Sequence, residues 1–107
     1  MPIYVLYAED KPNSLERRLE HYASHRAFIE AQDGTGGVSV VVSGPLQTDD
    51  GESMIGSMIV LEAETRAAVD RFVAEDPFMR EGVWGEVNIA RFYRRYAVGQ
   101  SLPPLQR

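Results

Sequence analysis

Two histidines four residues apart raise the question of chemistry in this 107-residue chain. The sequence SLERRLEHYASHRAFIE, residues 14–30, holds His21 and His25, the only histidines of the protein. On a helix this spacing places both imidazoles on one side, one turn apart. The pair could ligate a metal ion, one imidazole could act as a general base, or both could belong to a solvated surface.

A metal site has little support in the sequence. The i,i+4 pair supplies two ligands, but the HExxH pattern is absent and the chain has no cysteine to complete a tetrahedral set. Neither GxGxxG nor GxxxxGK[ST] occurs, so no nucleotide loop is predicted. We therefore expect a protein without metal or cofactor, with His21 in solvent.

His25 is the stronger candidate for proton transfer. At 100° per residue it lies about 40° from Ile29, at the margin of the apolar side of its predicted helix. A half-buried imidazole there could take a proton from carbon or water as a general base. It could equally be a hydrogen-bonded boundary residue that packs on the sheet.

Asp76 is the carboxylate with the clearest local pattern. Asp76-Pro77, followed by Gly82, is typical of a helix N-cap with proline at the first helical position. The same carboxylate could orient a histidine and stabilise its protonated form, as the aspartate of a catalytic triad does. We expect the two roles to coexist only if one oxygen caps the turn while the other reaches His25.

Small residues occur at the end of one predicted strand and inside the next: Ser43-Gly44-Pro45 and Gly56-Ser57. Turn chemistry or a closely packed neighbouring strand explains both. Alternatively, the glycines permit close approach of a ligand, to which Ser43 donates a hydrogen bond. No nucleophile-elbow motif surrounds Ser43, so it is not expected to be a nucleophile.

Three arginines accompany the histidines. Arg26 falls inside the apolar arc, where it could bind a substrate carboxylate bidentately or extend its head group to water. Arg17 and Arg18 have glutamate–arginine spacings typical of a solvated helix face. Arg17 could still line the mouth of a pocket.

Composition excludes several classes of function. The formal net charge of −5 lacks the basic footprint of a nucleic-acid-binding protein. The absence of cysteine excludes disulfides and thiolate chemistry. The first residues, MPIYVLYAED, have neither the basic region of a signal peptide nor an apolar run that could span a membrane. We expect a cytoplasmic protein that binds neither nucleic acid nor membrane.

These residues need elements to position them, and hydrophobic periodicity predicts the order β-α-β-β-α-β. Strands are expected at residues 3–8, 38–44, 54–63 and 83–96, and helices at about 15–31 and 65–75. The turn at Gly44-Pro45 should close the second strand. The first helix should bury a stripe made of Leu15, Leu19, Tyr22 and Ile29.

This order predicts an α+β, ferredoxin-like fold, with an antiparallel four-stranded sheet and both helices on one face. The last strand carries apolar residues on both sides, with Val87, Ile89 and Tyr93 on one and Trp84, Ala90 and Phe92 on the other. Because two helices cover only one face, we expect a homodimer in which sheet packs on sheet.

Four sequence pieces together resemble the YCII-related family of dimeric α+β-barrel proteins. They are YAEDKPNSLERRL with the following histidine (residues 7–25), SGPL (43–46), GS (56–57) and EDPF with GV (75–83). The likeness covers residues 1–96, which we expect to form the family's ferredoxin-like domain. Residues 97–107 are expected to be a C-terminal tail.

The resemblance implies a dimer with a pocket between helix and sheet, in which His25 and Asp76 form the active-site pair. Similar proteins act in the breakdown of aromatic compounds: the muconolactone isomerases share the fold, and one family member is associated with dehydrochlorination. Arg26 and Ser43 stand where the family commonly has leucine and alanine, which implies a more polar pocket here.

The expected function is therefore that of a small cofactor-independent enzyme, an isomerase or lyase acting on a small organic acid or aromatic-breakdown compound. His25 would be general base and acid, Asp76 would polarise it, and Ser43 or amides near Gly44 would stabilise an oxyanion. The predicted substrate contacts are Ser43, Gly44, Pro45, Ser57, Arg26 and Arg17. One alternative is a pocket that holds a metabolite without catalysis, as a binding or regulatory module. Another is a cofactor-free oxygenase that acts on an electron-rich aromatic substrate.

Overall fold

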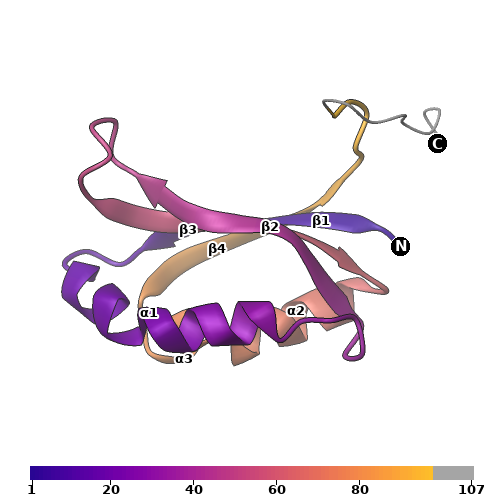
Figure 1. Cartoon of the computed structure of the whole chain (residues 1–107), viewed down its shortest axis with the longest axis horizontal. Helices are drawn as coiled ribbons and strands as arrows, with labels where there is room; N and C mark the ends of the chain where they lie inside the picture. The colour runs from indigo at the N-terminus through magenta and orange to yellow at the C-terminus, as the bar shows by residue number, and fades with distance from the viewer. Residues whose placement is uncertain (98–107) are drawn as a thin grey trace.

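An antiparallel four-stranded sheet forms one layer of the protein and helices form the other (Figure 1). The computed structural model describes residues 1–97, so the predicted tail at 97–107 lies, apart from Ala97, outside the described residues. The elements are β1 (Ile3–Asp10), α1 (Leu15–Glu30), β2 (Val38–Gln47), β3 (Met54–Ala63), α2 (Arg66–Glu75), α3 (Pro77–Arg80) and β4 (Trp84–Phe92). Their order in the sheet is β2-β3-β1-β4, which confirms the ferredoxin-like α+β fold.

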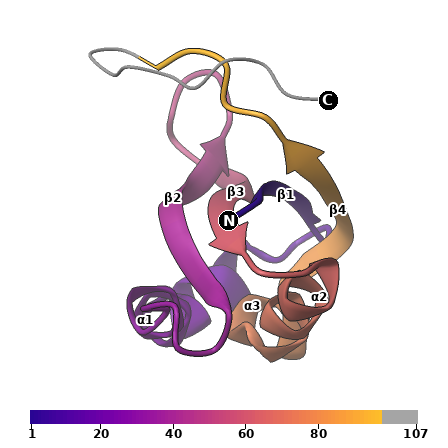
Figure 2. The ribbon, with the colours of Figure 1, turned by 90° about the vertical axis from the view of Figure 1, so that its right-hand side faces the viewer.

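The helices share one face of the sheet, with α1 below the β2 side and α2 and α3 below the β4 side (Figure 2). The core between the layers is apolar. Its fully buried members include Leu6, Ile59, Leu61, Val69 and Phe78. Within α2 the residues predicted to be buried are buried: Ala68, Val69, Phe72 and Val73.

The face of α1 that packs on the sheet differs from the predicted one. Leu15, Leu19 and Tyr22 are 42%, 65% and 48% exposed, and of the predicted stripe only Ile29 packs against the core. The helix instead buries Arg18 and His25. At 100° per residue Arg18 and His25 lie about 60–80° from the centre of the predicted stripe, on the side of Ile29. Burial of a charged side chain requires partners, and the surrounding strands supply them.

The second strand continues beyond its predicted end. Pro45 pairs with Ser57 in the ladder between β2 and β3, and the strand runs on to Gln47. Because β2 is an edge strand, its proline needs no partner for the missing N–H group. The fourth strand is shorter than predicted and ends at Phe92.

A β-bulge changes the face of Trp84. Ala8 pairs with Val87 and Asp10 pairs with Trp84, so β4 has one more residue than β1 over this interval. Trp84 therefore turns to the helix side, where it is buried. The prediction that it shares a side with Ala90 and Phe92 was wrong, because strict alternation fails at a bulge.

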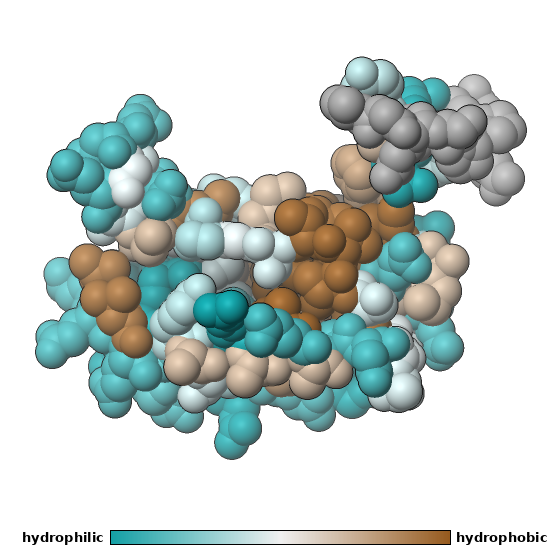
Figure 3. Space-filling view, viewed as in Figure 1, coloured by the Kyte–Doolittle hydropathy of each residue, from teal (hydrophilic) through white to brown (hydrophobic). Residues whose placement is uncertain are grey.

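The face of the sheet opposite the helices carries exposed apolar side chains. The pairing register places Tyr7, Val42, Met58 and Phe92 on that face, and each is at least 42% exposed. On the side of the molecule nearest the viewer in Figure 1, hydrophobic side chains gather over β2 (Figure 3). Among the described residues, no helix is both long and apolar enough to cross a membrane.

Candidate active site

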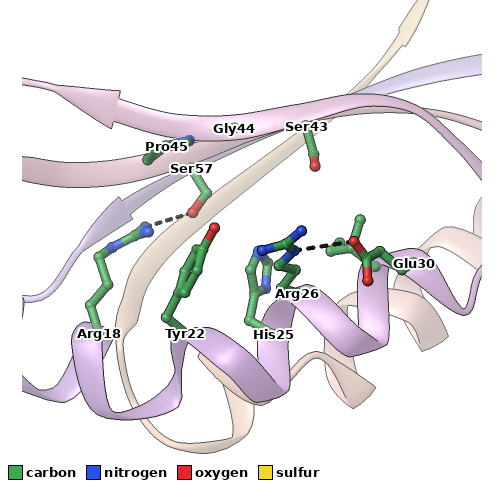
Figure 4. Close-up of a pocket in the computed structure, with 10 residues that line it drawn as sticks. Arg18, Tyr22, His25, Arg26, Glu30, Ser43, Gly44, Pro45 and Ser57 are labelled. Atoms are coloured by element: carbon green, nitrogen blue, oxygen red, sulfur yellow. Dashed lines mark hydrogen bonds and ion pairs between the residues drawn. The ribbon is translucent and has the colours of Figure 1, made fainter.

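A cavity of about 250 Å³ lies between α1 and the paired strands β2 and β3. Figure 4 shows side chains rising from α1 toward the strands, with polar groups of the strands facing them. The residues that line the cavity are Arg18, Tyr22, His25, Arg26, Ile29, Glu30, Ser43, Gly44, Pro45 and Ser57. The volume lies near the lower end of small-molecule sites, which suits a compact ligand.

His25 lies in the wall of this cavity and bonds to a carboxylate beneath it. Its Nδ1 atom is 2.8 Å from Oδ1 of Asp76, and the contact is buried. Since a carboxylate only accepts hydrogen bonds, the Nδ1–H group donates. The lone pair of the neutral imidazole is then on Nε2, for which no described residue provides a hydrogen bond. This tautomer is the one a general base needs.

Asp76 stands at the junction of α2 and α3 and is fully buried. Its Oδ1 atom also accepts from the backbone N–H of Phe78 at 2.8 Å and so caps α3. The expectation that the two carboxylate oxygens divide these roles was wrong, because Oδ1 accepts both hydrogen bonds. The other oxygen, Oδ2, is buried and has no hydrogen-bond partner among the described residues.

Phe78 fixes the plane of the imidazole. Its ring stacks on that of His25 with centroids 4.0 Å apart and an angle of 8° between the planes. The indole of Trp84 meets the imidazole edge to face at 6.1 Å. Packed against these two rings, the imidazole has a fixed orientation in the cavity wall.

Arg18 forms a buried polar network at one end of the cavity. Its Nε and Nη2 atoms donate to Oδ2 and Oδ1 of Asp10 at 2.7 and 3.2 Å. Nη2 also donates to the carbonyl oxygen of Gly56 and to Oγ of Ser57, both at 2.6 Å. The guanidinium carbon lies 4.6 Å from the ring centroid of Phe78. The interpretation of Arg18 as part of a solvated face was therefore wrong.

Most of the predicted substrate contacts line the cavity. Ser43, Gly44, Pro45, Ser57 and Arg26 are all in its wall. Ser43 and Pro45 pair with Ile59 and Ser57, whose side chains face the helix layer. A Cβ atom at Gly44 would meet no other atom within 4 Å, so crowding does not require glycine there.

The two candidate arginines differ in position. Arg26 is at the rim, 64% exposed, and its Nε donates to Oε2 of Glu30 at 3.1 Å. Glu30, through this hydrogen bond and its charge, raises the pKa of the Arg26 guanidinium. Arg17 does not line the cavity, contrary to the expectation that it could form the mouth. It donates instead to the carbonyl oxygen of Gly82 at 3.5 Å.

Four side chains of the cavity were not recognised as site residues from the sequence: Arg18, Tyr22, Ile29 and Glu30. A signal was available: residues 18, 22, 25, 26 and 29 follow the i,i+4,i+7 spacing and share one side of α1. His21 is outside the lining, and its Nε2 lies 3.8 Å from Glu20 Oε1 and 3.9 Å from Glu81 Oε1.

Comparison of the sequence with known families gives a match over nearly all of the described chain. The model of the YCII-related domain matches residues 3–93. Protein YciI from Escherichia coli is 30% identical over 95 residues, which cover 84% of this chain and 95% of that protein. An uncharacterized protein from Haemophilus influenzae is 28% identical over 92 residues, or 83% and 94% of the two chains.

Solved structures with the same fold include enzymes. A 5-chloro-2-hydroxyhydroquinone dehydrochlorinase, TftG from Burkholderia phenoliruptrix, in complex with 2,5-dihydroxybenzoquinone, superposes with a TM-score of 0.74 at 30% identity. The superposition covers 85% of this chain and 93% of TftG. SnoaB from Streptomyces nogalater, a cofactor-independent oxygenase, gives a TM-score of 0.53 at 15% identity, over 92% and 97% of the chains, a likeness of fold alone.

Proposed function

The chain belongs to the YCII-related family, and from this premise we propose that it is a small enzyme that eliminates or isomerises by proton transfer. The substrate class is a compact ring compound that carries hydroxyl or carbonyl oxygens. His25 is the general base and acid, and Asp76 holds it in the required tautomer. The observation that carries the proposal is the buried 2.8 Å contact between these residues in the wall of a cavity.

The proposed step begins at a carbon next to a carbonyl group, which a chlorinated hydroxyhydroquinone presents in its diketo tautomer. The lone pair of His25 Nε2 takes the proton, the C–H electron pair forms a C=C bond, and the carbonyl π pair moves to oxygen, which gives an enolate. In an elimination, collapse of the enolate expels chloride from the adjacent carbon, and His25 passes its proton to water. Hydrogen chloride is lost overall. In an isomerisation, His25 returns the proton to another carbon.

The charges of the site support this step. The imidazolium formed in it is adjacent to the Asp76 carboxylate and stacked on Phe78, and each of these contacts stabilises positive charge. The cavity also carries hydroxyl groups of Ser43, Ser57 and Tyr22 that can donate to oxygen.

The exposed apolar face of the sheet supports a homodimer. Tyr7, Val42, Met58 and Phe92 make that face unusually apolar for a surface in water. A second copy that packs its own sheet on this one would bury both faces, with the isologous contact of a twofold axis. The helices and the cavity are on the opposite side of the sheet, so they stay open to substrate in such a dimer.

The direct test uses 5-chloro-2-hydroxyhydroquinone under anaerobic conditions and follows chloride with an ion-selective electrode. We expect protein-dependent chloride release that His25→Gln lowers by about 10²-fold or more. Glutamine can still donate a hydrogen bond to Asp76, so binding of 2,5-dihydroxybenzoquinone, measured by calorimetry, should change less than about threefold. Binding of this quinone with no chloride release and no His25 dependence would instead support a metabolite-binding module.

A further inference from the structure

The hydroxyl of Ser57 has both of its acceptor positions occupied by protein donors. Arg18 Nη2 donates to Oγ at 2.6 Å, and the indole Nε1–H of Trp84 donates to it at 3.1 Å. A guanidinium and an indole can only donate. A serine oxygen has two lone pairs, so Ser57 cannot accept a further hydrogen bond of ordinary geometry from a ligand.

Both donors are fixed in place. Arg18 is buried, and Asp10 together with the Gly56 carbonyl holds the same end of its guanidinium. Trp84 is buried on the helix side because the bulge in β4 turns it there. Arg18 Nη2 is held by these further acceptors, and the indole N–H of Trp84 cannot leave Ser57 without becoming a buried donor that lacks an acceptor, which costs about 1–3 kcal/mol.

The hydroxyl hydrogen of Ser57 is therefore available to donate a hydrogen bond to a ligand. Among the described residues Ser57 donates to no acceptor, although its residue is buried and lines the cavity. Two incoming hydrogen bonds, one from a cation, polarise the O–H bond and make it a stronger donor. Figure 4 shows the Ser57 oxygen on the cavity side of β3, with Arg18 beside it.

We propose that Ser57 acts towards the substrate only as a hydrogen-bond donor, an anchor that binds a carbonyl, enolate or phenolate oxygen. Because Arg18 donates to the Ser57 oxygen, its positive charge strengthens this hydrogen bond. The inference rests on the proposed function and specifies its substrate: one accepting oxygen at Ser57 and one transferable proton at His25. When Nε2 removes that proton, the negative charge that develops on the substrate oxygen strengthens the Ser57 hydrogen bond. A ligand that offers only N–H or O–H donors to this point is rejected, since Ser57 cannot accept.

The test uses 2,5-dihydroxybenzoquinone, a ring with four oxygens, and isothermal calorimetry at neutral pH. We expect Ser57→Ala to weaken binding about 10-fold or more, the loss of one hydrogen bond to a charged oxygen. Ser24→Ala is the control: it removes a hydroxyl from the exposed surface of α1, outside the cavity lining, and we expect less than a threefold change. Equal effects of the two substitutions, or none at Ser57, overturn the anchor.

Ser57→Ala leaves the buried indole N–H of Trp84 without an acceptor and could prevent folding, so a second measurement uses the wild-type protein. In a crystal structure with the same quinone we expect a ligand oxygen within about 3 Å of Ser57 Oγ. A quinone bound elsewhere in the cavity overturns the proposal.

The two proposals fail in different ways. If Ser57→Ala weakens binding but His25→Gln leaves chloride release unchanged, the role of Ser57 in binding is supported and proton transfer by His25 is refuted. If His25→Gln abolishes release and Ser57→Ala does not affect affinity, the reverse holds. If the wild-type protein binds no quinone at all, both are overturned.

Discussion

Nδ1 of His25 lies 2.8 Å from Oδ1 of Asp76, a contact between residues 51 positions apart in the chain. It joins the middle of α1 to the junction of α2 and α3. Phe78 contacts both residues, because its backbone N–H donates to the same Oδ1 atom of Asp76 and its ring stacks on the imidazole of His25. The orientation of His25 and the start of α3 are therefore coupled through one carboxylate oxygen.

This coupling predicts different results for two substitutions of Asp76. In Asp76→Asn the Phe78 N–H group requires an acceptor, so the amide oxygen stays at the Oδ1 position and His25 keeps its tautomer. We expect a folded protein that has lost the negative charge and with it about 10²-fold or more in chloride release. In Asp76→Ala both hydrogen bonds are lost, and unfolding should become easier by about 2–4 kcal/mol.

Urea denaturation measures the stabilities, and ¹⁵N NMR of the imidazole reports the tautomer. Full activity in Asp76→Asn would show that the charge of Asp76 has no part in the reaction. A changed tautomer in that variant would contradict the argument that Phe78 fixes the amide.

The Arg18–Asp10 pair predicts strong energetic coupling. Its side chains are 4% and 7% exposed, and breaking a buried pair leaves an uncompensated charge. We expect Asp10→Ala to lower the free energy of unfolding by about 3 kcal/mol, and a double-mutant cycle with Arg18→Met to give a coupling of about 2 kcal/mol. The control cycle is Arg26→Ala with Glu30→Ala, an exposed pair that should couple by less than about 0.5 kcal/mol. Equal coupling in the two cycles would contradict the buried network.

The same pair explains where prediction from sequence succeeded and where it failed. Element order and fold class follow from periodicity and turn residues, and the Asp-Pro pattern at residue 76 indicates a cap that the structure contains. The buried face of α1 could not be predicted from a helical wheel. Leu15 and Leu19 look like core residues and Arg18 like a surface residue until Asp10 and Ser57, from two different strands, are known to meet it.

The bulge at Trp84 is a second limit of the same kind. A period of two assigns strand residues to alternate faces, and one extra residue in β4 reverses the assignment from that point. Sequence alone does not mark the extra residue. The contacts of Trp84 with Ser57 and His25 were therefore not predictable, although all three residues had been considered individually.

Gly56 occupies a position where we expect that a single added methyl group is not tolerated. A Cβ atom there would clash with the carbonyl oxygen of Ala8 and lie 3.0 Å from Cδ1 of Leu46. We expect Gly56→Ala to destabilise the protein by about 2 kcal/mol or more, because β1 and β3 must separate. Gly36→Ala is the control, since a Cβ atom at Gly36 meets nothing within 4 Å. Thermal unfolding of both variants measures the difference, and equal melting temperatures would refute the close contact.

The exposed face of the sheet gives the last prediction. Met58 belongs to the outward face of β3 and is 42% exposed, whereas Leu19 on α1 is more exposed at 65%. If sheet packs on sheet, a charge at Met58 is buried without a partner in the dimer, and a charge at Leu19 stays in water. We expect Met58→Glu to give monomers in sedimentation velocity at concentrations of about 10–50 μM, where the wild type and Leu19→Glu remain dimers. A dimer that Leu19→Glu dissociates and Met58→Glu preserves would move the interface from the sheet to the exposed side of α1.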